Sequence, residues 1–314
     1  MSYRSALIAP WILISAGVAS AASIDDGTGS KGFKFLQVAV DARSAALARA
    51  SVASGGSQTM LTVNPAGLAD VSAFHLAGAH TEWLSTIRHE YLGIAWPQFD
   101  GVVAVALRAQ TSGDIPLRAI DDGTSFVGVP SPEPQGTYGV HDAAFTVAYA
   151  RRIGRFDWGV GASYVYEKIY FSSVSAAALD IGVRWHAGRV TVGAALRNIG
   201  VSERLRAERV PLPWDAQAGV MYERPVAGMT IRTMADVRYA PDFYETLHLG
   251  AEAQLTSVFV LRAGYQTNGV KNPDDTGLSA GTGLRYGAFR LDYAYIPERD
   301  GLGSGHLFNL SIGR

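Results

Sequence analysis

The sequence predicts an all-β fold: a 14-stranded antiparallel transmembrane β-barrel, preceded by a short N-terminal hatch or plug that contains one or two short helices. Three observations lead to this prediction. Segments of about ten residues alternate between apolar and polar side chains, which is the length of a tilted strand that crosses a bilayer. The connections between these segments alternate between short and long. The residues before position 72 instead contain a Gly/Ser-rich lead, a short apolar run and helix-like pieces.

The predicted strands share a period of two, so that successive side chains point to opposite faces. They lie near 72–79, 90–98, 101–110, 142–152, 157–167, 176–186, 189–198, 213–222, 228–238, 245–254, 258–267, 276–286, 289–296 and 306–313. The pattern is clear where Leu179, Ile181 and Val183 alternate with Asp180 and Arg184. The first three segments are apolar on both faces, so their assignment rests more on length and position.

The connections distinguish a membrane barrel from a soluble β-sandwich, whose strands also alternate but usually have about five or six residues. Short connections are expected at 99–100, 153–156, 187–188, 223–227, 256–257 and 287–288, and longer ones at 80–89, 111–141, 168–175, 199–212, 239–244, 268–275 and 297–305. Outer-membrane barrels place short turns in the periplasm and long loops outside. The pattern therefore favours an outer-membrane barrel over 72–314, in contact with outer-membrane lipid.

The N-terminus predicts export. Residues 1–4 carry one positive charge, residues 6–18 are almost wholly apolar, and Ala19 to Ala21 fit a small-x-small cleavage site. We therefore expect residues 1–21 to be a secretory signal peptide of a Gram-negative type bacterium, the alternative being an uncleaved N-terminal helix. A formal net charge of −1 argues against a nucleic-acid partner.

Polar strand faces are expected to point into the lumen, where charges of both signs would pair. The predicted lumen network comprises Asp180, Arg184, Arg232, Asp236, Arg238, Glu252, Arg290 and Asp292. Fourteen strands enclose more space than their own side chains fill. Residues 22–71 are therefore expected to occupy part of the lumen as a hatch, and a flexible periplasmic lead is the alternative.

The hatch contains the stretch TVNPAGLADV at 62–71, which predicts a short capped helix. Asn64 can accept a backbone hydrogen bond as the N-cap residue. Pro65 fits the first helical position, where its missing N–H is not needed. Gly67 keeps the helix short. We expect this turn to mark the point where the hatch ends and the barrel wall begins.

Four N-terminal motifs carry a resemblance to a known family. Residues 35–36, 42–46, 50–53 and 64–69 read FL, ARSAA, ASVA and NPAGLA. Together they resemble the N-terminal signature of the PorV/PorQ family, which is related to the FadL-type fatty-acid transporters with their fourteen-stranded barrels and N-terminal hatch. The motif residues are Ala42, Arg43, Asn64, Pro65, Ala66, Gly67 and Leu68. The sequence departs from the family at 46–48, where Ala-Leu-Ala replaces Gly-Met-Gly, and it lacks a C-terminal aromatic residue.

No residue pattern indicates catalysis, a metal or a cofactor. The seven histidines are scattered without ligand spacing, and the absence of cysteine excludes disulfides, thiolate metal sites and cysteine nucleophiles. We therefore expect no enzyme activity and no cofactor. The best candidate for binding is the predicted loop 111–141, which is rich in apolar residues that would pack into the barrel mouth or contact a partner. Its candidate contact residues are Ile115, Leu117, Phe126, Val127 and Tyr138.

Three functions remain open. The PorV/PorQ resemblance implies docking and shuttling in type IX-like protein secretion, with secreted proteins or secretion-complex subunits as partners. The FadL relation implies passive uptake of a hydrophobic ligand such as a long-chain fatty acid, through an apolar pocket between loop 111–141 and hatch residues 33–40. A porin would instead have an open polar lumen and a disordered N-terminal segment.

Overall fold

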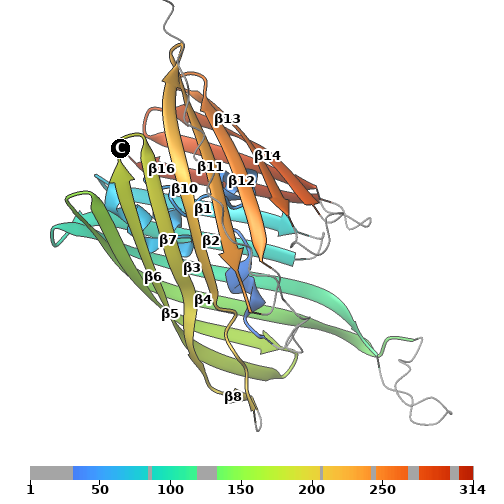
Figure 1. Cartoon of the computed structure of the whole chain (residues 1–314). Helices are drawn as coiled ribbons and strands as arrows, with labels where there is room; N and C mark the ends of the chain where they lie inside the picture. The colour runs from blue at the N-terminus through green and yellow to red at the C-terminus, as the bar shows by residue number, and fades with distance from the viewer. Residues whose placement is uncertain are drawn as a thin grey trace, which may run out of the picture.

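The computed structural model describes residues 31–83, 87–118, 133–205, 208–241, 245–267, 276–297 and 304–313. The predicted leader 1–21 and the first part of the predicted hatch, 22–30, lie outside the described residues. From residue 31 the chain runs through the interior of the barrel, and the wall begins at His75 (Figure 1). None of the described helices is long and apolar enough to span a membrane.

The wall is one closed antiparallel barrel of fourteen strands among the described residues, in the order β1-β16-β15-β14-β13-β12-β11-β10-β7-β6-β5-β4-β3-β2. Its strands are β1 (His75–Trp83), β2 (Ile87–Gln98), β3 (Gly101–Leu117), β4 (Gly136–Ile153), β5 (Phe156–Ile169), β6 (Ser172–Ala187), β7 (Val190–Ser202), β10 (Asp215–Val226), β11 (Met229–Tyr239), β12 (Thr246–Gln254), β13 (Phe259–Thr267), β14 (Thr276–Tyr286), β15 (Phe289–Pro297) and β16 (Ser304–Gly313). Two further short strands, β8 (Arg204–Leu205) and β9 (Glu208–Arg209), pair with each other between β7 and β10.

The barrel has an apolar exterior and a polar interior. On β6, Leu179, Ile181 and Val183 are about half exposed, whereas Asp180 and Arg184 are buried. Such an arrangement is stable where the exterior meets lipid, and closure of the sheet pairs every wall strand on both sides. The predicted fold class is thereby confirmed, and the soluble sandwich, which would bury its apolar face between two sheets, is wrong.

Short connections lie at one end of the barrel. They join consecutive strands at 99–100, 154–155, 188–189, 227–228, 255–258 and 287–288. His75 pairs with Gly313 at this same end, which identifies it as the periplasmic end. Two expected long connections are largely strand instead: β1 and β2 remain paired up to Trp83 and Ile87, and β5 and β6 are joined directly across 170–171. Continued pairing satisfies backbone groups that a loop would leave to water.

The predicted loop 111–141 is also shorter than expected. Ile115 and Leu117 belong to β3 and Tyr138 to β4, so their assignment to a loop is wrong, whereas Phe126 and Val127 lie outside the described residues. The β3–β4 ladder continues past a bulge between Ser112 and Ile115. The bulge places an extra residue in β3 without a partner in β4, and regular pairing resumes at Ile115 and Tyr138. In Figure 1 this side of the wall extends farthest from the periplasmic turns.

The hatch is built from short helical elements: the 3-10 helix η1 (Lys34–Gln37), the α-helix α1 (Ala42–Ala46), and the 3-10 helices η2 (Gln58–Thr62) and η3 (Pro65–Asp70). Asp41 caps α1 by accepting hydrogen bonds from the backbone N–H groups of Arg43 and Ser44. Asn64 caps η3, with Pro65 at its first position, as the sequence predicts. Each element is too short to be stable alone, so its conformation depends on contacts with the wall.

Glycines in the wall let the hatch backbone approach closely. A Cβ added at Gly159 on β5 would lie 2.4 Å from the carbonyl carbon of Pro65, and one at Gly264 on β13 would lie 2.2 Å from the backbone nitrogen of Ala48. Neither backbone atom can move aside without displacing the hatch. Part of the high glycine content of the chain therefore serves the contact between hatch and wall.

Replacing Gly264 or Gly159 by alanine should destabilise the protein by about 1–3 kcal/mol, because the new methyl group overlaps the hatch backbone. Thermal unfolding of the purified protein in detergent measures the effect. The matched control is Gly277→Ala on β14, where an added Cβ meets nothing within 4 Å. Equal midpoints for all three variants would contradict the close seating of the hatch.

Candidate functional site

The hatch spans the lumen from the loop end of the barrel to the periplasmic end. Near the loop end, the backbone N–H of Phe33 donates to the Glu167 carboxylate at 2.7 Å. Near the periplasmic end, the carboxylate of Asp70 lies 2.8 Å from the Arg184 guanidinium. Contacts at both ends and between them fix the hatch, so the lumen divides into spaces above, beside and below it.

Asn64 of the NPAGLA motif joins the hatch to the wall. Its side-chain amide nitrogen lies 2.7 Å from the carbonyl oxygen of Val52, 3.2 Å from that of Val183 and 3.4 Å from that of Ala194. Its side-chain oxygen accepts the N–H of Ala66 at 3.0 Å. One buried amide thus caps η3, ties two hatch segments together and contacts strands β6 and β7. This is a physical reason for asparagine, rather than aspartate, at this position.

Arg108 on β3 holds the other end of the hatch. Its buried guanidinium donates hydrogen bonds to the carbonyl oxygens of Phe35 (3.0 Å), Leu36 (3.3 Å) and Val38 (3.1 Å). The same group lies 5.9 Å from the centre of the Phe35 ring, within the range of a cation–π contact. These interactions supply donors to carbonyls at the end of η1. The Phe35 carbonyl also accepts the backbone N–H of Val38.

An apolar cluster lies at the loop end of the lumen, between the hatch and strands β4 to β6. Phe33 and Phe35 from the hatch are almost completely buried there. The other buried members are Leu36, Ala144, Val165, Val174, Ala176, Ala178 and Leu212. The cluster involves the hatch segment where the uptake hypothesis expects apolar residues. A larger apolar cluster around Val40, Leu61 and Leu68 joins the hatch to strands β1 to β4.

A row of polar side chains borders this cluster. His89, Gln110, Asp142 and Glu167 are register partners on the successive strands β2 to β5. Both ring nitrogens of His89, the Gln110 side-chain oxygen and one Asp142 oxygen are buried without a hydrogen-bond partner among the described residues. Buried polar atoms in this state call for water or a solute as partner. The row therefore holds hydrogen-bonding groups without protein partners beside the apolar cluster.

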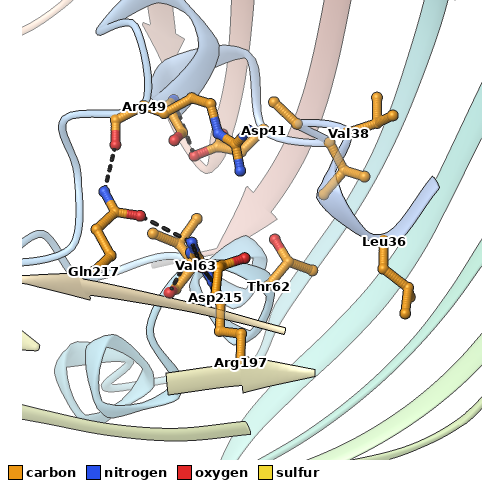
Figure 2. A pocket seen from close by; sticks show the side chains of 12 residues that line it. Leu36, Val38, Asp41, Arg49, Thr62, Val63, Arg197, Asp215 and Gln217 are labelled. Atoms are coloured by element: carbon orange, nitrogen blue, oxygen red, sulfur yellow. Dashed lines mark hydrogen bonds and ion pairs between the residues drawn. The ribbon is translucent and has the colours of Figure 1, made fainter. Parts of the chain in front are cut away.

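A small cavity lies beside the hatch, with a volume of about 20 Å³, enough for one water molecule (Figure 2). Gln217 links the hatch to the wall here, because it donates to the carbonyl of Arg49 and accepts from Arg197. Burial lowers the pKa of the Arg49 guanidinium, and the nearby cations Arg238 and Arg197 lower it further. Across the cavity, burial raises the pKa of the Asp41 carboxyl.

Below the hatch, one buried carboxylate forms ion pairs with three arginines. Glu252 on β12 accepts from Arg43 of α1 (2.8 Å), Arg232 of β11 (2.9 Å) and Arg262 of β13 (2.8 Å). Arg232 and Arg262 are its register partners on the two neighbouring strands, so the sheet places these charges side by side. Arg43, a residue of the N-terminal motif, thus anchors α1 to the wall through a buried ion pair.

The predicted lumen residues lie on the inner side of the wall in separate groups. Arg184 pairs with Asp157 and Asp70. Asp236 and Arg238 join the group around Gln217 and Asp215, and Asp180 accepts the backbone N–H of Asn198 at a bulge between β6 and β7. The other four predicted residues lie near the periplasmic end: Arg232, Glu252, Arg290 and Asp292. The remaining motif residues, Ala42, Pro65, Ala66, Gly67 and Leu68, are buried in the hatch.

Sequence reasoning missed Arg108, Asp142 and Asp157. Arg108 stands alone in a segment that is otherwise apolar on both faces, and this isolation is the signal that could have identified it. A single cation in such a strand usually has a buried partner. Its partners are backbone carbonyls, which no side-chain pattern reveals.

Solved structures with a similar fold cover most of the chain. The CymD monoaromatic hydrocarbon channel matches with a TM-score of 0.60 and 12% identity, over 88% of this chain and 96% of that one. The Pseudomonas putida toluene transporter TodX matches with a TM-score of 0.60 and 10% identity, over 87% and 96%. No protein-family model and no curated protein matches the chain.

The chain therefore has the fold of these two solved structures, a closed fourteen-stranded antiparallel β-barrel. At 10–12% identity the similarity establishes the fold only. The substrates of CymD and TodX are not thereby established for this chain. The fourteen strands and the N-terminal hatch expected from the FadL relation are both present. The narrower resemblance to PorV/PorQ is carried by the N-terminal residues alone.

Replacing Asn64 by aspartate should destabilise the seated hatch by about 1–3 kcal/mol, because a carboxylate cannot donate to the three carbonyl oxygens it would face. We expect a lower thermal midpoint, faster protease cleavage within 31–71, and a higher ion conductance in planar bilayers. The control is Thr62→Ala, because the Thr62 hydroxyl bonds only within its own helix. Unchanged cleavage and conductance in Asn64→Asp would contradict the anchoring role.

Proposed function

We propose that this protein is a passive channel for the uptake of uncharged hydrophobic small molecules across the outer membrane. The observation that carries the proposal is the apolar cluster around Phe33 and Phe35, located at the loop end of the lumen beside the polar row of His89, Gln110, Asp142 and Glu167. Its fold, shared with two hydrocarbon channels, supports the same function. This is the alternative that the FadL relation raised, and it is better supported than protein secretion.

The cluster is closed among the described residues, because Phe33 and Phe35 are almost completely buried. An apolar solute would therefore gain free energy by covering apolar surface only as these side chains move aside. Transfer of a ring-sized area of about 150 Å² from water contributes on the order of 4 kcal/mol, which suits weak and reversible binding during transport. Ions and sugars gain nothing from this cluster. Below it they meet a hatch that is hydrogen-bonded to the wall on several sides. Selectivity for apolar molecules therefore follows from the arrangement.

The polar groups beside the cluster favour an uncharged substrate over a fatty-acid carboxylate. Asp142 and Glu167 would repel a carboxylate at this level. The guanidinium of Arg108 already donates to three hatch carbonyls and is not placed to receive one. Monoaromatic hydrocarbons, alcohols and phenols fit these surroundings better than long-chain acids.

The other two functions have less support. A porin requires an open polar lumen, whereas residues 31–71 occupy the lumen here and contact the wall throughout. Docking of secreted proteins rests on the PorV/PorQ resemblance of the N-terminal motifs. The apolar residues expected to carry its contacts, Ile115, Leu117 and Tyr138, lie in strands and are only partly exposed.

Uptake of a radiolabelled monoaromatic hydrocarbon should be faster in bacterial cells whose outer membrane carries this protein than in cells without it. Val174→Asp should lower the difference about tenfold, because a carboxylate would replace apolar surface in the cluster. The milder variant Val174→Thr keeps the side-chain shape and should lower the difference in uptake several-fold.

The matched control is Ser173→Asp, which adds the same charge at an exposed neighbouring position. Heat-modifiable migration on gels confirms that each variant forms a barrel. Equal uptake by Val174→Asp and Ser173→Asp would contradict the assigned route, and passage of glucose as fast as the hydrocarbon would support a porin instead. A secreted protein that co-purifies with the barrel would support docking.

A further inference from the structure

A second space opens at the opposite end of the lumen from the apolar cluster. This periplasmic vestibule lies between the underside of the hatch and the turn-proximal ends of β10 to β15, and its volume is about 320 Å³. It is lined by Arg43, Gly55, Gly56, Asp70, Met221, Glu223, Arg232, Glu252, Gln254, Val260, Arg262, Arg285 and Arg290. Five of these side chains are arginines, and the space is open toward the periplasm.

Positive charge exceeds negative charge in the vestibule. Two of its arginines, Arg290 and Arg262, share the Asp292 carboxylate. Glu252 and Glu223 are the other acids that pair with its arginines. Five guanidinium groups thus face three carboxylates.

The fourth nearby acid, Asp70, does not reduce this excess. Its carboxylate is paired with Arg152 and Arg184, and both of these also pair with Asp157. Two arginines and two aspartates therefore form a neutral group of their own at the edge of the vestibule. The buried N-cap residue Asp41 also interacts electrostatically with Arg43, Arg262 and Arg290. The vestibule therefore keeps an excess of one positive charge when the Asp41 carboxyl is ionised and of two when it is protonated.

Two arginines have donors available for a ligand. The exposed side chain of Arg285 on β14 makes no ion pair or hydrogen bond among the described residues, and its register partner on β15 is Arg290. Arg262 is buried, and although its Nη1 lies 2.8 Å from Asp292, neither Nη1 nor Nη2 makes a hydrogen bond of good geometry. The buried, unpartnered donors of Arg262 indicate a missing acceptor beside the cavity. The exposed Arg285 side chain adds solvent-accessible donors to the lining of the same space.

We propose that the periplasmic vestibule is a binding site for an oxyanion, a molecule with a phosphate or carboxylate group that is held by Arg285 together with Arg262 and Arg290. The planar guanidinium matches the two oxygens of such a group and forms strong, charge-assisted hydrogen bonds with it. The volume admits a small molecule rather than a single ion. The site lies on the periplasmic side of the hatch and does not depend on the function proposed for the loop end.

Isothermal titration of the purified full-length protein in non-ionic detergent tests this site, with inorganic phosphate as the probe at constant ionic strength. Saturable binding that raises the thermal midpoint is expected. Arg285→Gln should weaken phosphate binding about tenfold, because it removes one charge-assisted donor pair. Glu223→Gln should strengthen binding several-fold, because it removes a lining carboxylate.

The matched control is Arg224→Gln, which makes the same change at an exposed position one residue from Glu223 on the opposite face of β10. Its phosphate affinity should equal that of the parent protein. Acetate and a short-chain phosphatidic acid, titrated separately, distinguish a carboxylate, a free phosphate and a lipid headgroup as the preferred source of the oxyanion.

Opposite shifts in Arg285→Gln and Glu223→Gln, with Arg224→Gln unchanged, would support the site. Absence of saturable binding by all three probes would overturn it, as would equal affinities in Arg285→Gln and Arg224→Gln. Because Arg285 makes no contact that holds the barrel together, the Arg285→Gln variant should keep its heat-modifiable gel migration.

Discussion

The structure depends on one constraint: inside a bilayer, every backbone N–H and C=O group needs a partner from the protein itself. Closure of the sheet meets this constraint for the wall and turns its apolar side chains outward. A closed wall of this size then creates an interior that its own side chains do not fill. The hatch occupies that interior, and its own backbone groups need partners as well. Arg108, Asn64 and His248 supply several of them from side chains.

The two ends of the lumen differ because the hatch uses different chemistry at each end. Toward the loops the hatch carries Phe33 and Phe35, which pack against apolar side chains of the wall. Toward the periplasm the hatch carries Arg43 and Asp70, which form ion pairs with Glu252 and Arg184 of the wall. One short segment thus lies between an apolar cluster and a cationic vestibule. The two proposed ligands, a hydrophobic solute and an oxyanion, would occupy opposite ends of the lumen.

Much of the wall could be predicted, because each long strand repeats the same local alternation. The deviations occurred where pairing between strands overrode local signals. Gly113 and Pro116 indicate a loop, yet β3 continues through them because β4 provides a partner beyond the bulge. The candidate site was less accessible to prediction. The row of His89, Gln110 and Asp142 exists only because the register of β2 to β4 aligns residues from distant parts of the chain.

The sequence by itself determined that this chain forms a barrel with its oily face outward, that charges of both signs line its interior, and that a capped turn at Asn64 precedes the wall. These features are local, since they depend on a period of two and on capping within a few residues. Tertiary structure alone decided where the hatch sits, which carbonyls Arg108 binds and which arginines share the vestibule. Those outcomes depend on register and closure, which join residues from twenty to more than two hundred positions apart. No local pattern encodes such distances.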